Sequence, residues 1–298
     1  IEGLPPDRES LHPDSTHPRG YVYGNLRAPA PVLWTLGISY DYFNESEEEL
    51  EISQPNPKFG VQWNVTDEIR LRAAAFRVVK PALVNNRTLE PTQIGGFNQF
   101  FDDLNATKSW RYGVGLDWRP TSSLFAGTEF SWRDLDEPVS DDGSTKFEKR
   151  NEQLYRGYLY WTPLPQLALS AELIYDRYHA EQGLATTFDG LPRKVETLSV
   201  PVVARYFHPS GWFAGVGGTY VDQQVRRANF ESDDFLVVDV LAGYRFPNRL
   251  GVASVQVNNL FDTGLHYQDD SFREFRDDPS ISRYIPERTV LGRITINF

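Results

Sequence analysis

The sequence ends in Arg288-Thr289-Val290-Leu291-Gly292-Arg293-Ile294-Thr295-Ile296-Asn297-Phe298, where apolar and polar residues alternate up to the last position. In an extended chain one side would carry only apolar residues and glycine, namely Val290, Gly292, Ile294, Ile296 and Phe298. Apart from Leu291, the other side is polar. A period of two is typical of a β-strand with one apolar and one polar face. The stretch therefore predicts a closing amphipathic strand that ends on an aromatic residue.

Composition limits the class of protein. The chain has 298 residues, enough for one large domain or two. Its mean hydropathy is negative, and no apolar run approaches the ~20 residues that a membrane-spanning helix needs. A helical membrane protein is excluded by this pattern. A membrane β-barrel is not excluded, because only every second residue of each strand must be apolar.

Charge and cysteine content remove further classes. The chain contains no cysteine, so a disulfide framework and a thiolate metal site are both excluded. A formal net charge of −11 argues against a nucleic-acid partner. Because the sequence starts at Ile1 and shows no signal peptide, we expect a processed product or a piece of a longer chain.

The alternation of the closing stretch recurs along the chain. It predicts twelve strands and a weaker one over residues 20–26; the twelve cover residues 34–42, 59–65, 69–75, 110–118, 124–132, 155–161, 167–175, 198–206, 212–220, 236–246, 253–257 and 288–298. Short turns alternate with loops of a dozen residues or more. This asymmetry is typical of bacterial outer-membrane barrels, which have short periplasmic turns and long extracellular loops. We therefore predict an all-β, transmembrane, antiparallel up-and-down β-barrel of about 12–14 strands over residues 19–298, after a linker or loop over residues 1–18.

The number of strands bears on closure of the barrel. Single-chain bacterial barrels close with an even number of strands, and twelve would close without residues 20–26. If that segment is a strand, its partner must come from residues 1–18 or from a part outside the sequence.

The tryptophans fall at the ends of the predicted strands. The residues beside the short turns are Trp34, Trp63, Trp118, Trp161, Trp212 and Phe298. The residues at the loop ends are Trp110 and Trp132. Two aromatic belts about one bilayer apart are typical of residues at the membrane interface. The alternative is that aromatic residues are simply common in strands. We predict contact with outer-membrane lipid.

The second face of the strands carries charges of both signs, and we predict that it lines a lumen. The charged candidates are Arg70, Arg72, Arg111, Asp117, Glu129, Arg133, Arg156, Glu172, Asp176, Arg205, Asp239, Arg245 and Arg293. The same charges on the lipid side would cost about 2–4 kcal/mol each near the midplane. The alternative for each residue is an ion pair that only holds the wall together.

The loop over residues 81–109 is unusually long for a connection. After Gly95-Gly96 it gathers aromatic, amide and acidic side chains, namely Phe97, Asn98, Gln99, Phe100, Phe101, Asp102 and Asp103. We predict that this segment folds into or over the lumen and constricts it. The alternative is an external loop that packs on its neighbours.

Two stretches resemble known families. Asn258-Asn259-Leu260-Phe261-Asp262, then Tyr267, Pro286-Glu287-Arg288-Thr289 and the terminal Phe298, resemble the C-terminal end of TonB-dependent outer-membrane receptors. Residues 88–93 and 96–103 resemble barrels fused behind tetratricopeptide repeats, such as export porins for exopolysaccharides. A full TonB-dependent receptor has a plug domain and some twenty-two strands. Because this sequence shows no plug and little more than half of those strands, we expect either a fragment or a different, smaller barrel.

The resemblances imply location and partners. They imply a bacterial outer-membrane protein whose closing strand is recognised by the barrel-insertion machinery, with a periplasmic repeat or plug domain upstream. The first functional interpretation is a conduit that passes a polar substrate through a charged lumen gated by loops. The alternatives are the C-terminal part of a TonB-dependent uptake receptor and a non-conducting anchor or assembly platform. We expect no enzyme activity, cofactor, metal site or nucleic-acid binding.

Overall fold

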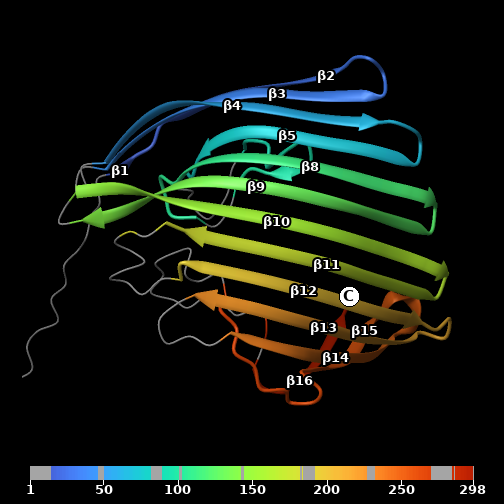
Figure 1. Ribbon diagram of the computed structural model, residues 1–298. Coiled ribbons are helices and arrows are strands. Elements are labelled where there is room, and N and C mark those ends of the chain that lie inside the picture. Colours follow the sequence, from blue (N-terminus) through green and yellow to red (C-terminus); the bar gives the residue numbers. More distant parts are fainter. Residues whose placement is uncertain are drawn as a thin grey trace, which may run out of the picture.

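The computed structural model describes residues 15–45, 50–81, 89–100, 103–141, 144–181, 183, 192–226, 232–269, 284 and 286–297. Apart from one 3₁₀ turn at Pro247–Arg249, the regular elements in these ranges are strands. Figure 1 shows most of them side by side in one large curved sheet. No helix in the described ranges is long and apolar enough to cross a membrane.

The strands follow one another around the sheet in chain order. Their bounds are β1 Ser15–Thr16, β2 Arg19–Arg27, β3 Val32–Glu45, β4 Leu50–Asn64, β5 Ile69–Val79, β6 Gln93–Ile94, β7 Phe97–Asn98, β8 Lys108–Thr121, β9 Leu124–Asp141, β10 Ser144–Leu164, β11 Leu167–Ala180, β12 Lys194–Phe207, β13 Trp212–Arg226, β14 Asp233–Arg245, β15 Gly251–Asn258 and β16 Thr289–Ile296. From β3 onward, each strand of the large sheet pairs antiparallel with the next strand of that sheet in chain order, while β6 and β7 form a separate two-stranded hairpin.

The first two strands occupy one position in the sheet. Both β1 and β2 pair with β3, and they are interrupted only at His17 and Pro18. Counting them as one, the fourteen-stranded sheet has thirteen positions in up-and-down order. The predicted all-β antiparallel architecture and the range of 12–14 strands are confirmed. In the part of the chain that the structure describes, pairing begins at Ser15, so β1 lies inside residues 1–18, which were predicted as linker or loop.

The described sheet has two edges. Residues 20–26, the weakest predicted strand, lie in β2, which pairs with β3 alone among the described strands. At the other end, β16 pairs with β15 alone in the described ranges. With thirteen antiparallel positions, the first and last strands run in the same direction. The two therefore cannot join directly as an antiparallel pair.

Alternation of side chains gives the sheet two different faces. The face that we call apolar exposes Leu36, Val114 and Ile294, which are 49%, 55% and 73% exposed. The opposite face, which we call polar, carries Arg72, Asp117 and Glu129. The register of the strands keeps each set on one side through the whole sheet. The faces predicted from the sequence are therefore confirmed.

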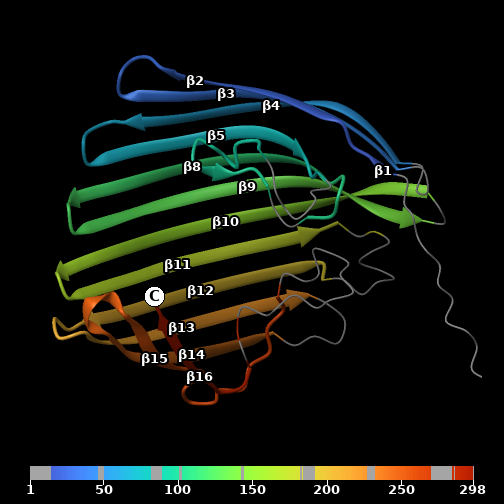
Figure 2. The ribbon, with the colours of Figure 1, turned by 180° about the vertical axis from the view of Figure 1, so that it is seen from behind.

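Two strands are longer than the sequence predicted. Residues 134–151 were predicted to be a polar loop, which is wrong, because β9 and β10 remain paired from Trp161↔Leu124 to Ser144↔Asp141. Ion pairs across this hairpin favour a strand despite the polar composition. Arg150 Nε lies 3.0 Å from Glu137 Oε2, and burial in the hairpin raises the pKa of Glu137 to about 7, although Arg150 acts in the opposite direction. Both strands project beyond the ends of their neighbours β8 and β11 (Figure 2).

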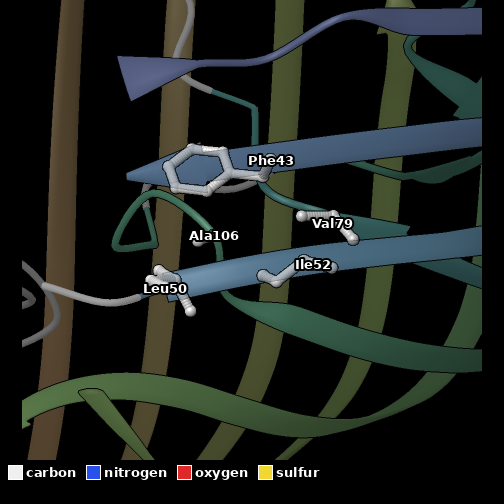
Figure 3. Close-up of a cluster of buried hydrophobic side chains, with 5 residues drawn as sticks. All are labelled: Phe43, Leu50, Ile52, Val79 and Ala106. Atoms are coloured by element: carbon white, nitrogen blue, oxygen red, sulfur yellow. The ribbon is translucent and has the colours of Figure 1, made fainter. Parts of the chain in front are cut away.

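The buried apolar clusters lie at the end of the sheet that bears the long connections, which we call the long-loop end. One cluster, drawn in Figure 3, brings together Phe43, Leu50, Ile52, Val79 and Ala106. Its members come from three consecutive strands and from the connection between β5 and β8. This connection therefore packs on the sheet. The opposite end, where adjacent strands are joined by short turns, is called the short-turn end below.

The C-terminal motif is a compact hydrogen-bonded corner. Asn259 is 1% exposed and has a φ of +49°, a conformation that asparagine tolerates better than most residues. Its side-chain amide donates to the Thr263 and Pro286 carbonyls at 2.9 and 3.3 Å, and its Oδ1 accepts from Thr263 N at 2.9 Å. Asp262 Oδ1 accepts from Arg288 N at 2.9 Å. The motif fixes how the chain leaves β15 and enters β16.

Candidate functional site

The described part of the long segment, residues 89–100 and 103–107, lies on the polar face of the sheet. Its centre is the β6–β7 hairpin, which turns at Gly95 and Gly96 with φ values of +59° and +91°. The wall leaves room for the hairpin at Gly60, which has no side chain. A Cβ at this position would lie only 2.7 Å from Gly95 N. Glycine at positions 95 and 96 permits the positive φ of the turn, and glycine at position 60 permits the close approach of the two backbones. The hairpin thus rests directly on β4 and β5.

Phe97 anchors the hairpin to the wall. The side chain is 1% exposed, and its ring covers Gly113 of β8. Two guanidinium groups flank the ring, with the Arg72 and Arg111 Cζ atoms 5.2 and 5.8 Å from its centroid. Such cation–π contacts strengthen when they are shielded from water. Phe97 also belongs to a buried cluster with Ile94 and Phe76.

Ion pairs on the wall hold Arg72 in place. Arg72 Nε lies 3.0 Å from Asp117 Oδ2, and Arg72 Nη2 lies 3.2 Å from Glu129 Oε2. The Tyr158 hydroxyl donates to Asp117 on the far side. These residues come from β5, β8, β9 and β10, so the network spans four neighbouring strands.

A second set of contacts binds the returning part of the segment. Arg111 Nη1 donates to the Asn98 carbonyl at 3.0 Å, and its Nη2 donates to Ser131 Oγ at 2.9 Å. Arg133 pairs with Asp103 of the segment and, at 2.6 Å, with Glu152 of β10. Both arginines are at most 5% exposed. Charged hydrogen bonds at this level of burial are among the stronger contacts in a protein.

The first strands bind the other side of the segment. Arg19 of β2 pairs with Asp41 of β3 at 3.1 Å and with Glu90 of the segment. The Tyr23 hydroxyl donates to the same Glu90 carboxylate, and Gln99 Nε2 lies 3.2 Å from Tyr23 Oη. The segment is therefore fixed to the wall from β2 to β10. These contacts were missed from the sequence, because Glu90 and Tyr23 are separated by 67 residues.

The predicted constriction residues are only partly brought together. Phe97, Gln99 and Asp103 are buried against the wall, Asn98 is exposed, and Phe100 lies with its ring 5.4 Å from Arg19 Cζ. Phe101 and Asp102 lie outside the described residues. The structure places the segment on the polar face, and whether it narrows a passage stays a prediction.

The predicted lumen charges fall into two groups. Arg72, Asp117 and Glu129 pair with one another, and Arg156 pairs with Glu172 at 2.8 Å. A second group, all exposed and at the polar face, makes no ion pair with any other residue in the described ranges: Arg70, Arg205, Arg245 and Arg293.

Two of the predicted lumen charges, Asp239 and Arg70, have non-ionic partners. Asp239 accepts a hydrogen bond from Asn259 N at 2.9 Å, so it supports the C-terminal motif. Arg70 Nε donates to Asn64 Oδ1 at 2.8 Å.

The predicted interface aromatics lie on the apolar face. Exposed among them are Trp63, Trp118, Trp132, Trp161 and Trp212. Trp34 and Trp110 are half-buried, and Phe298 lies outside the described residues. Their contact with the membrane interface stays a prediction. Among the described residues, no group of three or more histidine, aspartate or glutamate side chains is placed to hold a metal ion.

Three solved structures show the same fold at low identity. The ferric enterobactin receptor PfeA of Pseudomonas aeruginosa, as a mutant, is 15% identical with a TM-score of 0.58, over 84% of this chain and 40% of that one. The FrpB iron transporter of Neisseria meningitidis is 15% identical with a TM-score of 0.60, over 84% and 41%. The copper transporter OprC is 15% identical with a TM-score of 0.61, over 96% and 48%. The chain thus spans less than half the length of these three proteins.

A family model agrees with the structural likeness. No curated protein matches the sequence. The model described as TonB dependent receptor-like, beta-barrel matches residues 5–260, which is most of the chain. This match confirms that the chain resembles TonB-dependent receptor barrels, and it gives no support to the resemblance to export porins. It also agrees with the prediction that the chain is not an enzyme. The chain belongs to the TonB-dependent receptor-like β-barrel family, whose members are outer-membrane proteins.

Proposed function

We propose that this chain forms part of the wall of an uptake receptor that takes a solute inward across the outer membrane. The observation that carries the proposal is the segment over residues 89–100 and 103–107, bound to the polar face by the buried ion pairs of Arg19 with Glu90 and of Arg133 with Asp103. A passage with a fixed obstruction suits gated transport better than free diffusion. The family supports the same choice.

The names of the similar structures support a proposal for the cargo. One is named a ferric enterobactin receptor, one an iron transporter and one a copper transporter. We propose a metal ion or metal chelate as the cargo of this chain as well. Release would require a periplasmic energy-coupling partner and a plug-type domain, as in the family that the chain belongs to.

Closure of the wall requires further strands. In a bilayer, unpaired backbone groups at the free edges of β2 and β16 would cost several kcal/mol each. Because these two strands run in the same direction, only an odd number of added strands restores antiparallel pairing throughout. We propose that such strands complete the barrel, supplied by the same polypeptide or by a second copy.

A test of energised uptake distinguishes an uptake receptor from a conduit and from a non-conducting anchor. Cells that produce the complete protein are supplied with radioactive ferric chelates and copper under metal limitation, with and without TonB. The proposal expects accumulation of at least one of them that is lost without TonB. Accumulation that is independent of TonB would instead support a conduit. Surface-exposed, correctly folded protein that accumulates none of the solutes would support an anchor.

A further inference from the structure

The apolar face of the sheet becomes charged toward the long-loop end. On β8 the side chains that share this face run from Val114 through Trp110 to Lys108. The register places Trp110 beside Asp134 and Lys108 beside Asp136 of β9, so the change from apolar to charged occurs at the same level on neighbouring strands. The side of the sheet that is predicted to face lipid therefore ends in a band of charged residues.

Aromatic rings mark the level at which the charges begin. The Trp110 and Tyr112 rings are stacked, with centroids 5.9 Å apart and an interplanar angle of 6°. Phe130, Tyr155 and Tyr175 continue the row on the next three strands, with centroids 4.7 and 5.9 Å apart. Such rings favour the head-group level of a membrane. Because the family is an outer-membrane one with long loops outside, charges just beyond these rings lie among the head groups of the outer leaflet.

A hollow lies directly against this aromatic row. It has a volume of about 500 Å³, and its lining includes Trp110 and three basic residues, Arg77, Lys108 and Lys149. The register places Arg77 beside Trp110, and Asp136 beside both lysines, so these side chains share the same side of the sheet. A volume of several hundred Å³ is large enough for a small polar group such as a lipid head group.

The three basic residues have no ionic partner in the described ranges. Arg77 Nε is buried and makes no hydrogen bond to any described residue. Lys108 Nζ lies 3.7 Å from the centroid of the Phe147 ring, a contact that holds the ammonium group without neutralising it. A buried charged donor without an acceptor is unfavourable, so these groups suit a ligand that supplies oxygen acceptors.

Three acids share the lining with the basic residues, namely Asp134, Asp136 and Glu181, and none of them forms an ion pair with a described residue. Asp134 accepts hydrogen bonds from Trp132 Nε1 and Asn151 Nδ2, each at 3.0 Å. A simple anion would be repelled by these acids. A phosphate that carries a divalent cation fits both signs of charge, because Mg²⁺ is commonly bound by one or two carboxylates together with phosphates. The described residues offer no group of three acids or histidines for a metal ion, so the phosphate oxygens are needed as well.

We infer that this hollow binds the phosphate head group of an outer-leaflet lipid together with a divalent cation. Arg77, Lys108 and Lys149 bind the phosphate oxygens, since guanidinium and ammonium groups both suit phosphate. Asp136, which the register places between the two lysines, holds the cation against the phosphate. The inference needs the barrel to lie in the outer membrane, but it does not depend on the uptake of a solute.

The position of the hollow favours a lipid over a soluble anion. The residues that follow it along β8 on the same side are Tyr112, Val114 and Leu116, which are 43%, 55% and 37% exposed. A soluble anion would make no use of this apolar surface. A lipid can place its phosphate in the hollow and its acyl chains along these side chains, so both parts of one molecule meet a matching surface.

Native mass spectrometry of the complete, delipidated protein in detergent tests the inference. The probe is diphosphoryl lipid A in the presence of Mg²⁺, and digalactosyl diacylglycerol is the matched glycolipid without phosphate. We expect saturable binding of the phosphorylated lipid, about tenfold weaker when Mg²⁺ is chelated. Arg77→Gln and Lys149→Gln should each weaken it about tenfold, and Arg77→Lys should weaken it less. Asp136→Asn should abolish the gain from Mg²⁺.

Lys194→Gln is the matched control. Lys194 lies on the same side of the sheet, beside His179 of the hollow, but it already pairs with Glu196 at 2.6 Å. It should leave binding unchanged. Equal weakening by Lys194→Gln, equal binding of the galactolipid, a gain from Mg²⁺ that persists in Asp136→Asn, or no saturable binding would each overturn the inference.

Two further outcomes would also overturn it by naming another occupant. Displacement of the lipid by excess inorganic phosphate would assign the hollow to a soluble anion. A dimer that Lys149→Gln dissociates would assign it to a second copy of the chain. Because lipid binding needs no TonB, loss of the proposed uptake with intact lipid binding would count against the proposed function alone.

Discussion

The ring of Phe97 fills the space that a side chain at position 113 would need. A Cβ at Gly113 would lie 2.5 Å from Cδ1 and from Cε1 of the ring, far inside ordinary contact. The two residues belong to the β6–β7 hairpin and to β8. The absence of a side chain at Gly113 therefore allows the β6–β7 hairpin to pack against the wall.

Replacing Gly113 should unseat the hairpin. Gly113→Val forces Phe97 off the wall, so we expect a higher single-channel conductance in planar bilayers and faster proteolysis within residues 89–107. Gly217→Ala is the control, because a Cβ there meets Val203 at an ordinary 3.5 Å on the same face. Deletion of residues 94–104 should raise conductance at least as much. Conductance unchanged in both variants would rule out a constriction by this segment.

Breaking the buried triad around Arg133 should destabilise the protein. Arg133→Met leaves Asp103 and Glu152 buried without their cation, with an expected loss of about 3–5 kcal/mol in the free energy of unfolding. Arg156→Met removes a more exposed pair with Glu172, where the side chains are 33% and 19% exposed, and should cost at most about 1 kcal/mol. Urea unfolding in detergent micelles measures both. Similar losses in the two variants would contradict the assigned role of burial.

A charge should be tolerated on one face of β13 and rejected on the other. Val216 is 50% exposed on the apolar face, so Val216→Arg should cost about 2–4 kcal/mol in a bilayer. Thr219 lies on the polar face of the same strand, beside Pro201 and Val237, so Thr219→Arg should cost far less. Folding yield into lipid vesicles compares the two. A greater loss for Thr219→Arg would reverse the assignment of the faces.

The C-terminal corner should depend on the amide of Asn259. Asn259→Gly keeps the φ of +49° accessible but leaves the Thr263 N–H and the Pro286 carbonyl unsatisfied, at an expected cost of about 1–3 kcal/mol. Asn259→Ala should cost more than the glycine variant, because alanine is strained at positive φ. The control is Asn258→Ala, on the strand before the corner. Urea unfolding ranks the three, and equal values would contradict the argument.

The strands and their faces could be predicted from the sequence, because alternation is a local property with a period of two. It placed Leu36, Val114 and Ile294 on one side from neighbours alone. The extension of the β9–β10 hairpin over residues 134–151 could not be predicted from alternation. Its stability depends on pairs such as Arg150 with Glu137, and in a single sequence these look like the polar residues of a loop.

The position of the long segment was only partly predictable. Its glycines, aromatics and amides suggested contact with the lumen, but the binding partners lie far away in the chain, as for Tyr23 with Glu90. That no other described residue forms an ion pair with Arg205 is also a property of the assembled sheet. Residue types alone do not reveal which charges are compensated.

A nitroxide scan of the wall in lipid vesicles tests most directly whether the apolar face of the sheet contacts lipid. Because the chain has no cysteine, single labels can be placed at Leu36, Val114 and Val255 on the apolar face, and at Thr219 and Ser254 on the polar face. If the apolar face contacts lipid, labels on that face should collide with dissolved oxygen and be shielded from a water-soluble nickel reagent. Labels on the polar face should show the reverse. Equal water access on both faces, or the opposite pattern, would contradict a wall that turns its apolar side to lipid.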